Sequence, residues 1–218
     1  MKKINVSKIS SIVSELCIDA NYNLRRDIKS ALKTAVKKET QKSARNIIQI
    51  LLKNAQIAGL ESRALCQDTG IVSVYVELGQ EVRLFGGDLE NAVNEGVKRA
   101  YKEGFLRKSI VRSPMIRVNT CTNTPAVIHT EIVKGDRLKI SVMPKGFGSE
   151  NKSKIKMLNP TAGDKEIISF VLDVVKEAGP DGCPPYILGI GIGGTFDKAA
   201  FLAKKAFLMP INKNNPKK

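Results

Sequence analysis

The apolar residues of this chain switch repeatedly between helical and strand spacing, and this pattern constrains the fold more than any other feature. Helical spacing predicts helices at residues 6–17, 27–38, 43–59, 88–104, 167–175 and 195–207. Alternating or continuous apolar runs predict strands at residues 71–78, 126–133, 137–143 and 186–194. The sequence shows no internal repeat and no linker. We therefore expect a single α+β domain over residues 1–218, with a mixed or antiparallel sheet and packed helices.

Three local expectations refine this pattern. The strands at 126–133 and 137–143 flank a short turn, which is typical of an antiparallel hairpin. The segment at 144–163, PKGFGSENKSKIKMLNPTAG, is longer than a compact domain usually leaves without a purpose, so we expect a functional loop. Ser43 is the expected cap of the third helix, which ends near Gly59. The predicted inner face of that helix consists of Ile47, Ile48, Leu51, Leu52 and Ala55.

Composition limits the class of protein. The chain has 218 residues, 42% of them hydrophobic, which suffices for the core of an ordinary domain. No apolar run approaches the ~20 residues that a membrane span needs. Polar residues interrupt the starting segment MKKINVSKISSIVSEL where a signal peptide would be continuously apolar. We therefore expect a cytoplasmic protein with no membrane partner.

The formal net charge of +15 raises nucleic acid as a partner, because lysine and arginine displace counterions from phosphate backbones. Basic residues are spread along the chain among acidic ones, and aromatic residues, which stack on single-stranded bases, make up only 5%. This distribution favours a solvated, lysine-rich surface, which also attracts small dicarboxylates. Nucleic acid is therefore not the expected partner.

The cysteines and the histidine narrow the chemistry. Cys17, Cys66, Cys121 and Cys183 are far apart and match neither a disulfide-dense scaffold nor the paired spacing of a zinc site. Because His129 is the only histidine, mechanisms that need two histidines from this polypeptide are excluded. His129 lies in the middle of a predicted strand, where a structural role is expected. Cys17 falls on the inner face of a helix and is expected in the core.

Two turns carry residue types that suit catalysis. The letters CQDTG at 66–70 place a thiol, an amide and a carboxylate in one turn, although a partly buried cysteine in a capped turn is the alternative. The segment DGCPP at 181–185 places two prolines directly after Cys183. The prolines make the backbone rigid, which suits either a metal ligand or a simple turn.

A glycine-rich segment and a polar loop add further candidates. GIGIGG at 189–194 matches a dinucleotide-binding pattern, but the second strand ending in an acid that such a site requires is missing. These glycines are then expected to let the backbone approach a cofactor or an anion closely. The polar loop NTCTNTP contains Cys121 as a candidate ligand. Three arginines precede this loop: Arg107, Arg112 and Arg117. Arginine side chains are suited to bind substrate carboxylates.

Five ordered blocks of the sequence resemble the alpha subunits of class I fumarases and tartrate dehydratases. They span residues 64–206 and read ALCQDTG, LRKSIVRSP, NTCTNTPAVIHTEIV, MPKGFGSENKSKIKML and DGCPPYILGIGIGGTFDKAAFLAKKA. The resemblance implies the fold of an iron–sulfur fumarase alpha subunit. It also implies a hydro-lyase acting reversibly on a C4 dicarboxylate. Fumarate to malate is the first expected reaction, and tartrate to oxaloacetate is the second.

The resemblance further implies a 4Fe-4S cluster held by three cysteines, two of which match Cys66 and Cys183. One iron stays open to substrate and acts as a Lewis acid. In the family, a stretch beyond the matched region carries the third cysteine and an active-site histidine, and neither residue type follows Cys183 here. Cys121 stands where the family usually has a small residue, so it is not the expected third ligand. An isolated chain with two thiolates is expected to hold a cluster poorly.

The same resemblance assigns substrate-binding residues. Gln67 and Asp68 match pocket residues, with Asp68 assisting proton transfer to the departing hydroxyl. Arg107 matches the arginine that grips a carboxylate, and Gly148 matches a backbone contact to substrate, with Gly146 as the alternative. A separate beta subunit is expected to take the proton from carbon, which implies a hetero-oligomer.

Three explanations account for the absence of this stretch. They are a truncated or interrupted gene, a split subunit completed by another polypeptide, and a shortened, catalytically inactive paralogue that serves as an interaction or nucleic-acid-binding protein.

Overall fold

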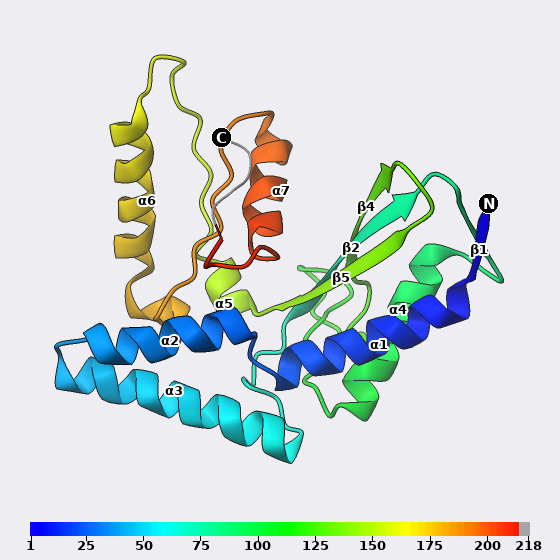
Figure 1. Ribbon diagram of the computed structural model, residues 1–218, viewed down its shortest axis with the longest axis horizontal. Helices are drawn as coiled ribbons and strands as arrows, with labels where there is room; N and C mark the ends of the chain where they lie inside the picture. Colours follow the sequence, from blue (N-terminus) through cyan, green and yellow to red (C-terminus); the bar gives the residue numbers. More distant parts are fainter. Residues whose placement is uncertain (214–218) are drawn as a thin grey trace. The chain divides into compact units, whose positions relative to one another are not determined.

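The computed structural model describes residues 1–213, which combine helices with small sheets (Figure 1). This mixture confirms the predicted combination of α and β structure. The chain divides into two compact units, Met1–Gly146 and Phe147–Lys218. The extent of one domain over residues 1–218 stays a prediction. Among the described residues, no helix has the length and apolar character that a bilayer crossing requires.

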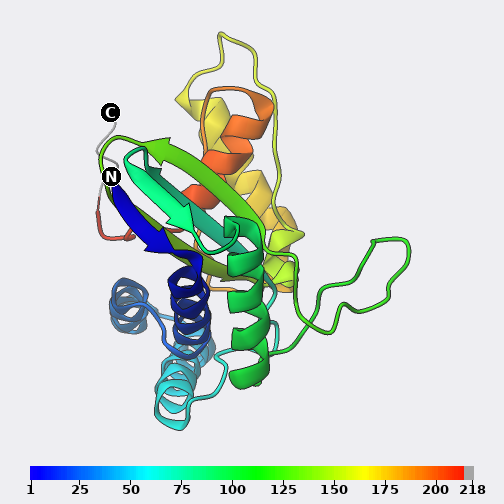
Figure 2. The same ribbon diagram turned by 90° about the vertical axis from the view of Figure 1, so that its right-hand side faces the viewer.

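The core of the first unit lies between two helices and a sheet (Figure 2). Helix α1 (Val6–Tyr22) and helix α4 (Leu89–Glu103) pack against each other and contribute to one buried cluster with strand β2 (Ile71–Gly79). The apolar stripes of the sequence explain this packing, because the residues at helical spacing are the buried ones. The cluster contains Val6, Ile9, Val13, Cys17, Val72, Val74, Val76, Ala92, Val93, Val97, Ala100, Tyr101 and Leu106.

Both predicted ends of α4 are confirmed. The Asp88 carboxylate accepts a hydrogen bond from the Asn91 amide (2.8 Å), which satisfies one of the free N–H groups in the first turn. Gly104 follows the last helical residue, and its amide donates to the carbonyl of Ala100 (2.8 Å). Local capping signals therefore sufficed to place this helix.

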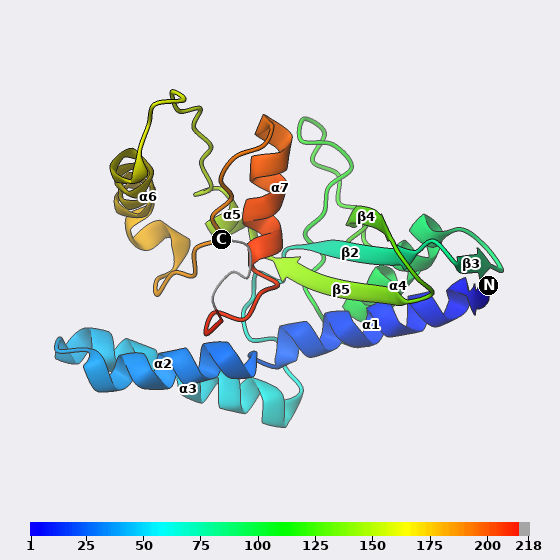
Figure 3. The same ribbon diagram turned by 45° about the horizontal axis from the view of Figure 1, so that its top comes forward.

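The three-stranded sheet has the order β4-β2-β5 and is mixed. Strand β4 (Val127–Val133) is parallel to β2, and β5 (Leu138–Lys145) is antiparallel to it (Figure 3). The predicted hairpin is therefore wrong, because β2 lies between the two strands. The valines of β2 are buried on one face, and Ser73 and Tyr75 are buried on the other, so this strand suits the central position.

A second, two-stranded sheet was not predicted. Its strands, β1 (Lys2–Asn5) and β3 (Val82–Phe85), are only four residues long and pair in parallel. Such short segments carry too little alternation for a sequence pattern to reveal them.

Helices α2 (Arg26–Lys38) and α3 (Lys42–Glu61) contact each other. The predicted cap of the third helix is wrong, because Gln41 occupies the N-cap and Ser43 lies inside the helix. The helix ends at Glu61, near the expected Gly59, and Ser62, with φ of 52°, occupies the C-cap. Of the predicted inner face, Ile48 and Ala55 are buried and Ile47 is 53% exposed. Helix α2, which packs on α3, contributes no buried residue of its own.

The second unit contains α5 (Phe147–Glu150), α6 (Asp164–Ala178), the 3-10 helix η1 (Gly179–Gly182) and α7 (Phe196–Ala206). Helices α6 and α7 confirm the two predicted there. The predicted loop contains the short helix α5, and the chain from 151 to 163 is otherwise irregular.

The predicted strand at 186–194 is wrong. The structure assigns no strand to this segment, and four of its apolar side chains are exposed: Ile187, Leu188, Ile190 and Ile192. No strand among the described residues pairs with it. Its glycines instead let the backbone approach α7, since a Cβ added at Gly191 would stand 2.1 Å from the carbonyl oxygen of Ala199. The close approach inferred from the glycines is thus made to a helix.

Candidate functional site

The turn at Cys66–Gly70 joins α3 to β2 in the first unit and has an exposed side and a buried side. Cys66 and Gln67 are exposed and Asp68 is partly exposed, whereas Thr69 and Gly70 are buried. Since α3 ends before the turn and β2 begins after it, the chain displays these polar groups without burying them. A thiol, an amide and a carboxylate therefore stand next to one another at the surface.

Hydrogen bonds within the turn fix its exposed side. The Asp68 amide donates to Sγ of Cys66 over 3.4 Å. The Cys66 thiol donates to Oε1 of Gln67, also over 3.4 Å.

Side chains from elsewhere in the first unit hold the buried side of the turn. The Thr69 hydroxyl donates to the carbonyl of Arg107 (2.8 Å), and the Tyr101 hydroxyl donates to the carbonyl of Thr69 (2.6 Å). The side-chain amide of Asn123 donates to the carbonyl of Gly70 (3.0 Å). Burial raises the pKa of the Tyr101 hydroxyl, so this group remains a donor at physiological pH.

The end of β5 packs closely against the turn. A Cβ at Gly70 would stand 1.9 Å from the carbonyl oxygen of Lys145, and φ at Gly70 is +61°, so only glycine fits there. A Cβ at Gly146 would stand 2.9 Å from Oδ2 of Asp68. The start of the predicted functional loop therefore lies beside the Asp68 carboxylate.

The predicted carboxylate-gripping residue, Arg107, follows α4 and is exposed. Its backbone carbonyl is bonded to Thr69, so the arginine is joined to the Cys66–Gly70 turn. The segment beyond it folds back at an isolated bridge between Val111 and Asn119. Cys121 is exposed in the same loop, with φ of 62° and an amide that donates to Oδ1 of Asn119 (2.7 Å).

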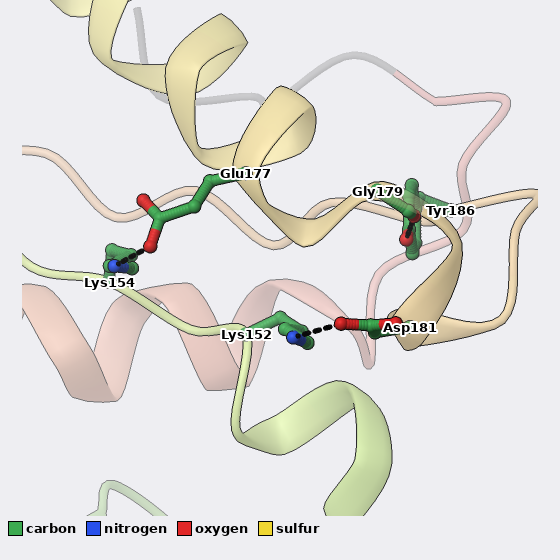
Figure 4. A network of polar contacts seen from close by, with 6 residues as sticks. All are labelled: Lys152, Lys154, Glu177, Gly179, Asp181 and Tyr186. Carbon is green, nitrogen blue, oxygen red and sulfur yellow. Dashed lines mark hydrogen bonds and ion pairs between the residues drawn. The ribbon is translucent and has the colours of Figure 1, made fainter.

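Cys183 lies in the second unit, just after η1, and its side chain is exposed. Its φ is 60°, and its amide donates to the carbonyl of Pro180 (3.1 Å). Figure 4 shows the surrounding contacts: Lys152 pairs with Asp181 at 3.0 Å, and Tyr186 bonds to the carbonyl of Gly179. The two prolines after Cys183 are thus accompanied by contacts at Asp181, which precedes the cysteine, and at Tyr186, which follows it.

Gly148 is exposed within α5, and a Cβ added there would meet no atom within 4 Å. No atom therefore crowds Gly148 on the side where a side chain would stand. Helix α5 and η1 contact each other within the second unit. Gly148 and Cys183 therefore belong to the same unit, whereas Cys66, Gln67, Asp68 and Arg107 belong to the first.

The described residues contain no group of three or more His, Cys, Asp or Glu side chains that could hold a metal. Cys66 and Cys183 each carry an exposed thiol that forms no disulfide, and the same holds for Cys121. Cys17 differs from them, since burial raises its pKa to about 12. The prediction that Cys17 belongs to the core is confirmed.

One further expectation concerns the sheet, and one residue of the loop was not expected. His129 is half-buried in β4 and stacks on Tyr75 with ring centroids 5.0 Å apart, which supports its structural role. Asn123 was not predicted as a site residue, although it is fully buried and bonded to the turn. No spacing in the sequence marks it, because its partner lies 53 positions away.

Comparison with known proteins gives one family. The family model described as Fumarate hydratase (Fumerase) matches residues 10–218. The chain is 40% identical over 214 residues to the putative L(+)-tartrate dehydratase subunit alpha of Methanocaldococcus jannaschii, covering 95% of this chain and 75% of the relative. It is 29% identical over 219 residues to the L(+)-tartrate dehydratase subunit alpha of Escherichia coli K12, covering 99% of this chain and 72% of the relative.

Proposed function

The chain belongs to the fumarate hydratase family, and from this premise we propose that it is the alpha-type subunit of an iron–sulfur hydro-lyase acting on a C4 dicarboxylate. Hydration of fumarate to malate is the first candidate reaction, in keeping with the description of the family. Dehydration of tartrate to oxaloacetate is the second, and the relatives named as tartrate dehydratase alpha subunits favour it. Those names also support a beta subunit as the partner.

One observation carries this proposal: a surface turn with a thiol and a carboxylate is bonded at its base to the segment that presents an arginine. Cys66 and Asp68 stand on the turn, and the Thr69 hydroxyl joins it to Arg107. A chemical site needs such supporting bonds, because exposed groups on unsupported loops do not keep a fixed geometry.

Cys66 and Cys183 are the proposed ligands of a 4Fe-4S cluster, to which they contribute two of three thiolates. The match of the chain to the family over residues 10–218 supports this assignment, and both thiols are exposed and form no disulfide. When bound, such a cluster supplies an open iron that acts as a Lewis acid on the substrate hydroxyl.

The remaining site residues bind substrate and move one proton. Dehydration breaks a C–O bond and a C–H bond, so the hydroxyl must receive a proton and the carbon must lose one. In this proposal Asp68 delivers the proton to the departing hydroxyl, and Gln67 orients that hydroxyl by hydrogen bonds. Arg107 binds one carboxylate through paired N–H donors, and the backbone at Gly148 contacts the substrate. A base on the beta subunit takes the proton from carbon.

The test is the hydro-lyase activity of the complete assembly. The full chain is combined anaerobically with its partner subunit, iron and sulfide, and the rates with fumarate and with tartrate are measured. We expect oxygen-sensitive activity from the wild-type assembly. Arg107→Gln should raise KM for the dicarboxylate about a hundredfold, because the charged hydrogen-bonded pair between the guanidinium and the substrate carboxylate is lost. Arg83→Gln, on the exposed side of β3, is the matched control and leaves KM unchanged. An assembly that binds iron and sulfide but acts on neither compound would overturn the substrate class.

A further inference from the structure

Among the described residues, Asn123 is the only one with a side-chain amide that is 0% exposed. Both the nitrogen and the oxygen of this amide form hydrogen bonds to the backbone. Nδ2 donates to the carbonyl of Gly70 (3.0 Å), and Oδ1 accepts from the amide of Ser109 (2.8 Å). Asparagine is suited to this position, because it offers a donor and an acceptor on one planar group and tolerates its φ of 59°. Asn123 therefore ties together two chain segments that are distant in sequence.

The Thr69 hydroxyl ties together the same two segments. Thr69 is 3% exposed and donates to the carbonyl of Arg107 (2.8 Å). One segment is thus held at its neighbouring residues Thr69 and Gly70, and the other at Arg107 and Ser109. Removing the Thr69 hydroxyl takes away a donor to the Arg107 carbonyl. Removing the Asn123 amide leaves the Gly70 carbonyl with the longer bond from the Tyr101 hydroxyl (3.3 Å). Each of the two bonds therefore favours one relative position of the segments.

The exposed ends of these segments carry the groups assigned to substrate. Asp68 immediately precedes Thr69, and the Arg107 side chain belongs to the residue whose carbonyl Thr69 binds. We propose that Asn123 and Thr69 are positioning residues that set the separation between the Asp68 carboxylate and the Arg107 guanidinium. This proposal rests on the proposed function, and it names two buried residues that determine how well the site matches the length of a C4 dicarboxylate.

The kinetic test uses the complete assembly and four variants. Thr69→Val removes the hydroxyl with little change in volume, whereas Thr69→Ser keeps it. Asn123→Ala removes both amide bonds. Asn94→Ala is the matched control, because Asn94 also accepts from a backbone amide of this loop, at Ala126 (2.9 Å), but bonds neither Gly70 nor Ser109.

We expect Thr69→Val and Asn123→Ala to raise KM for the dicarboxylate about tenfold, since small displacements of binding groups have large effects. Thr69→Ser should restore the wild-type KM, and Asn94→Ala should leave it unchanged. A merely structural role would lower Tm and the amount of active protein while KM stayed constant. Unchanged KM in folded Thr69→Val would overturn the proposal.

Hydrogen exchange on the full chain separates this proposal from the proposed function. In Thr69→Val, the amides of residues 67–70 and 107–110 should lose protection together, and in Asn94→Ala neither group should change. Loss of protection in only one segment would show that Thr69 does not couple them. If the wild-type assembly hydrates no dicarboxylate, the proposed function fails, and the exchange result still decides whether the coupling exists.

Discussion

The carboxylate of Asp68 and the α-carbon of Gly146 are immediate neighbours: a Cβ added at position 146 would stand 2.9 Å from Oδ2 of Asp68. We therefore expect Gly146→Ala to push the carboxylate aside and to lower the hydration rate about tenfold or more. Because Oδ2 is the end of a side chain, the free energy of unfolding should change by less than about 1 kcal/mol. Steady-state rates and urea denaturation measure the two effects.

The control for this variant is Gly163→Ala, whose added Cβ would lie at an ordinary 3.6 Å from Glu166. It should keep the wild-type rate. Equal rates for the two variants would mean that the position of Asp68 does not matter for the reaction.

Gly70 and Gly135 form a second matched pair. Both have positive φ, +61° and +93°, but a Cβ at Gly70 would stand 1.9 Å from the carbonyl oxygen of Lys145, whereas one at Gly135 would meet nothing within 4 Å. We expect Gly135→Ala to cost about 1 to 2 kcal/mol of backbone strain alone. Gly70→Ala should cost clearly more, on the order of 4 kcal/mol or beyond, because backbone must move. Urea denaturation measures the free energy of unfolding of the two variants. Similar losses of this free energy would contradict the close packing of β5 on the turn.

Stability should fall in alkaline solution because of Cys17. Its pKa is raised by burial from 9.0 to about 12, so between these values the unfolded chain loses a proton that the folded chain keeps. The unfolded state then binds fewer protons, and the free energy of unfolding decreases as pH rises, by up to about 1.4 kcal/mol per pH unit. Below pH 9 this contribution is fully present.

The measurement is denaturation of wild type and Cys17→Ala from pH 8 upward. The variant is less stable at pH 8, because it leaves a cavity, but its stability should decline less steeply with pH. Parallel declines would show that Cys17 does not titrate differently in the two states.

How far the sequence determines the structure depends on the range of the contact involved. Helix α4 was predicted at both ends because Asp88 and Gly104 act on neighbouring residues. The pairing of β4 and β5 with β2 was not predicted, because two strands joined in a hairpin and two strands separated by a third have the same local sequence pattern. Only the burial of β2 on both faces, through Ser73 and Tyr75, decides in favour of insertion.

The candidate site shows the same division. The exposed turn with Cys66 follows from its residue types and its place between a helix and a strand. The bonds of Asn123 and Thr69 to distant carbonyls do not, because a buried side-chain bond has no sequence period. The segment at 186–194 was predicted as a strand from its apolar residues alone, but strand formation also needs a partner with free backbone groups.

The ion pair between Lys152 and Asp181 stands next to the Cys183 turn, whereas the pair between Lys154 and Glu177 (2.6 Å) connects the same loop to α6 (Figure 4). Exposed pairs add little to overall stability, so Asp181→Asn and Lys154→Met should both fold. We expect Asp181→Asn to retain less iron after gel filtration, because the turn that carries the thiol is held less firmly. Lys154→Met should retain the wild-type amount, and equal retention would argue against a role for the pair.

The central claim is that Cys66 and Cys183 bind one iron–sulfur cluster. It is tested most directly by the iron and sulfide content of the anaerobically reconstituted complete assembly, measured together with its electron paramagnetic resonance spectrum. Cys66→Ser and Cys183→Ser should each lose the cluster, and Cys121→Ser, which changes an exposed cysteine outside the proposed ligand set, should keep it. Full cluster content in either of the first two variants would contradict the account.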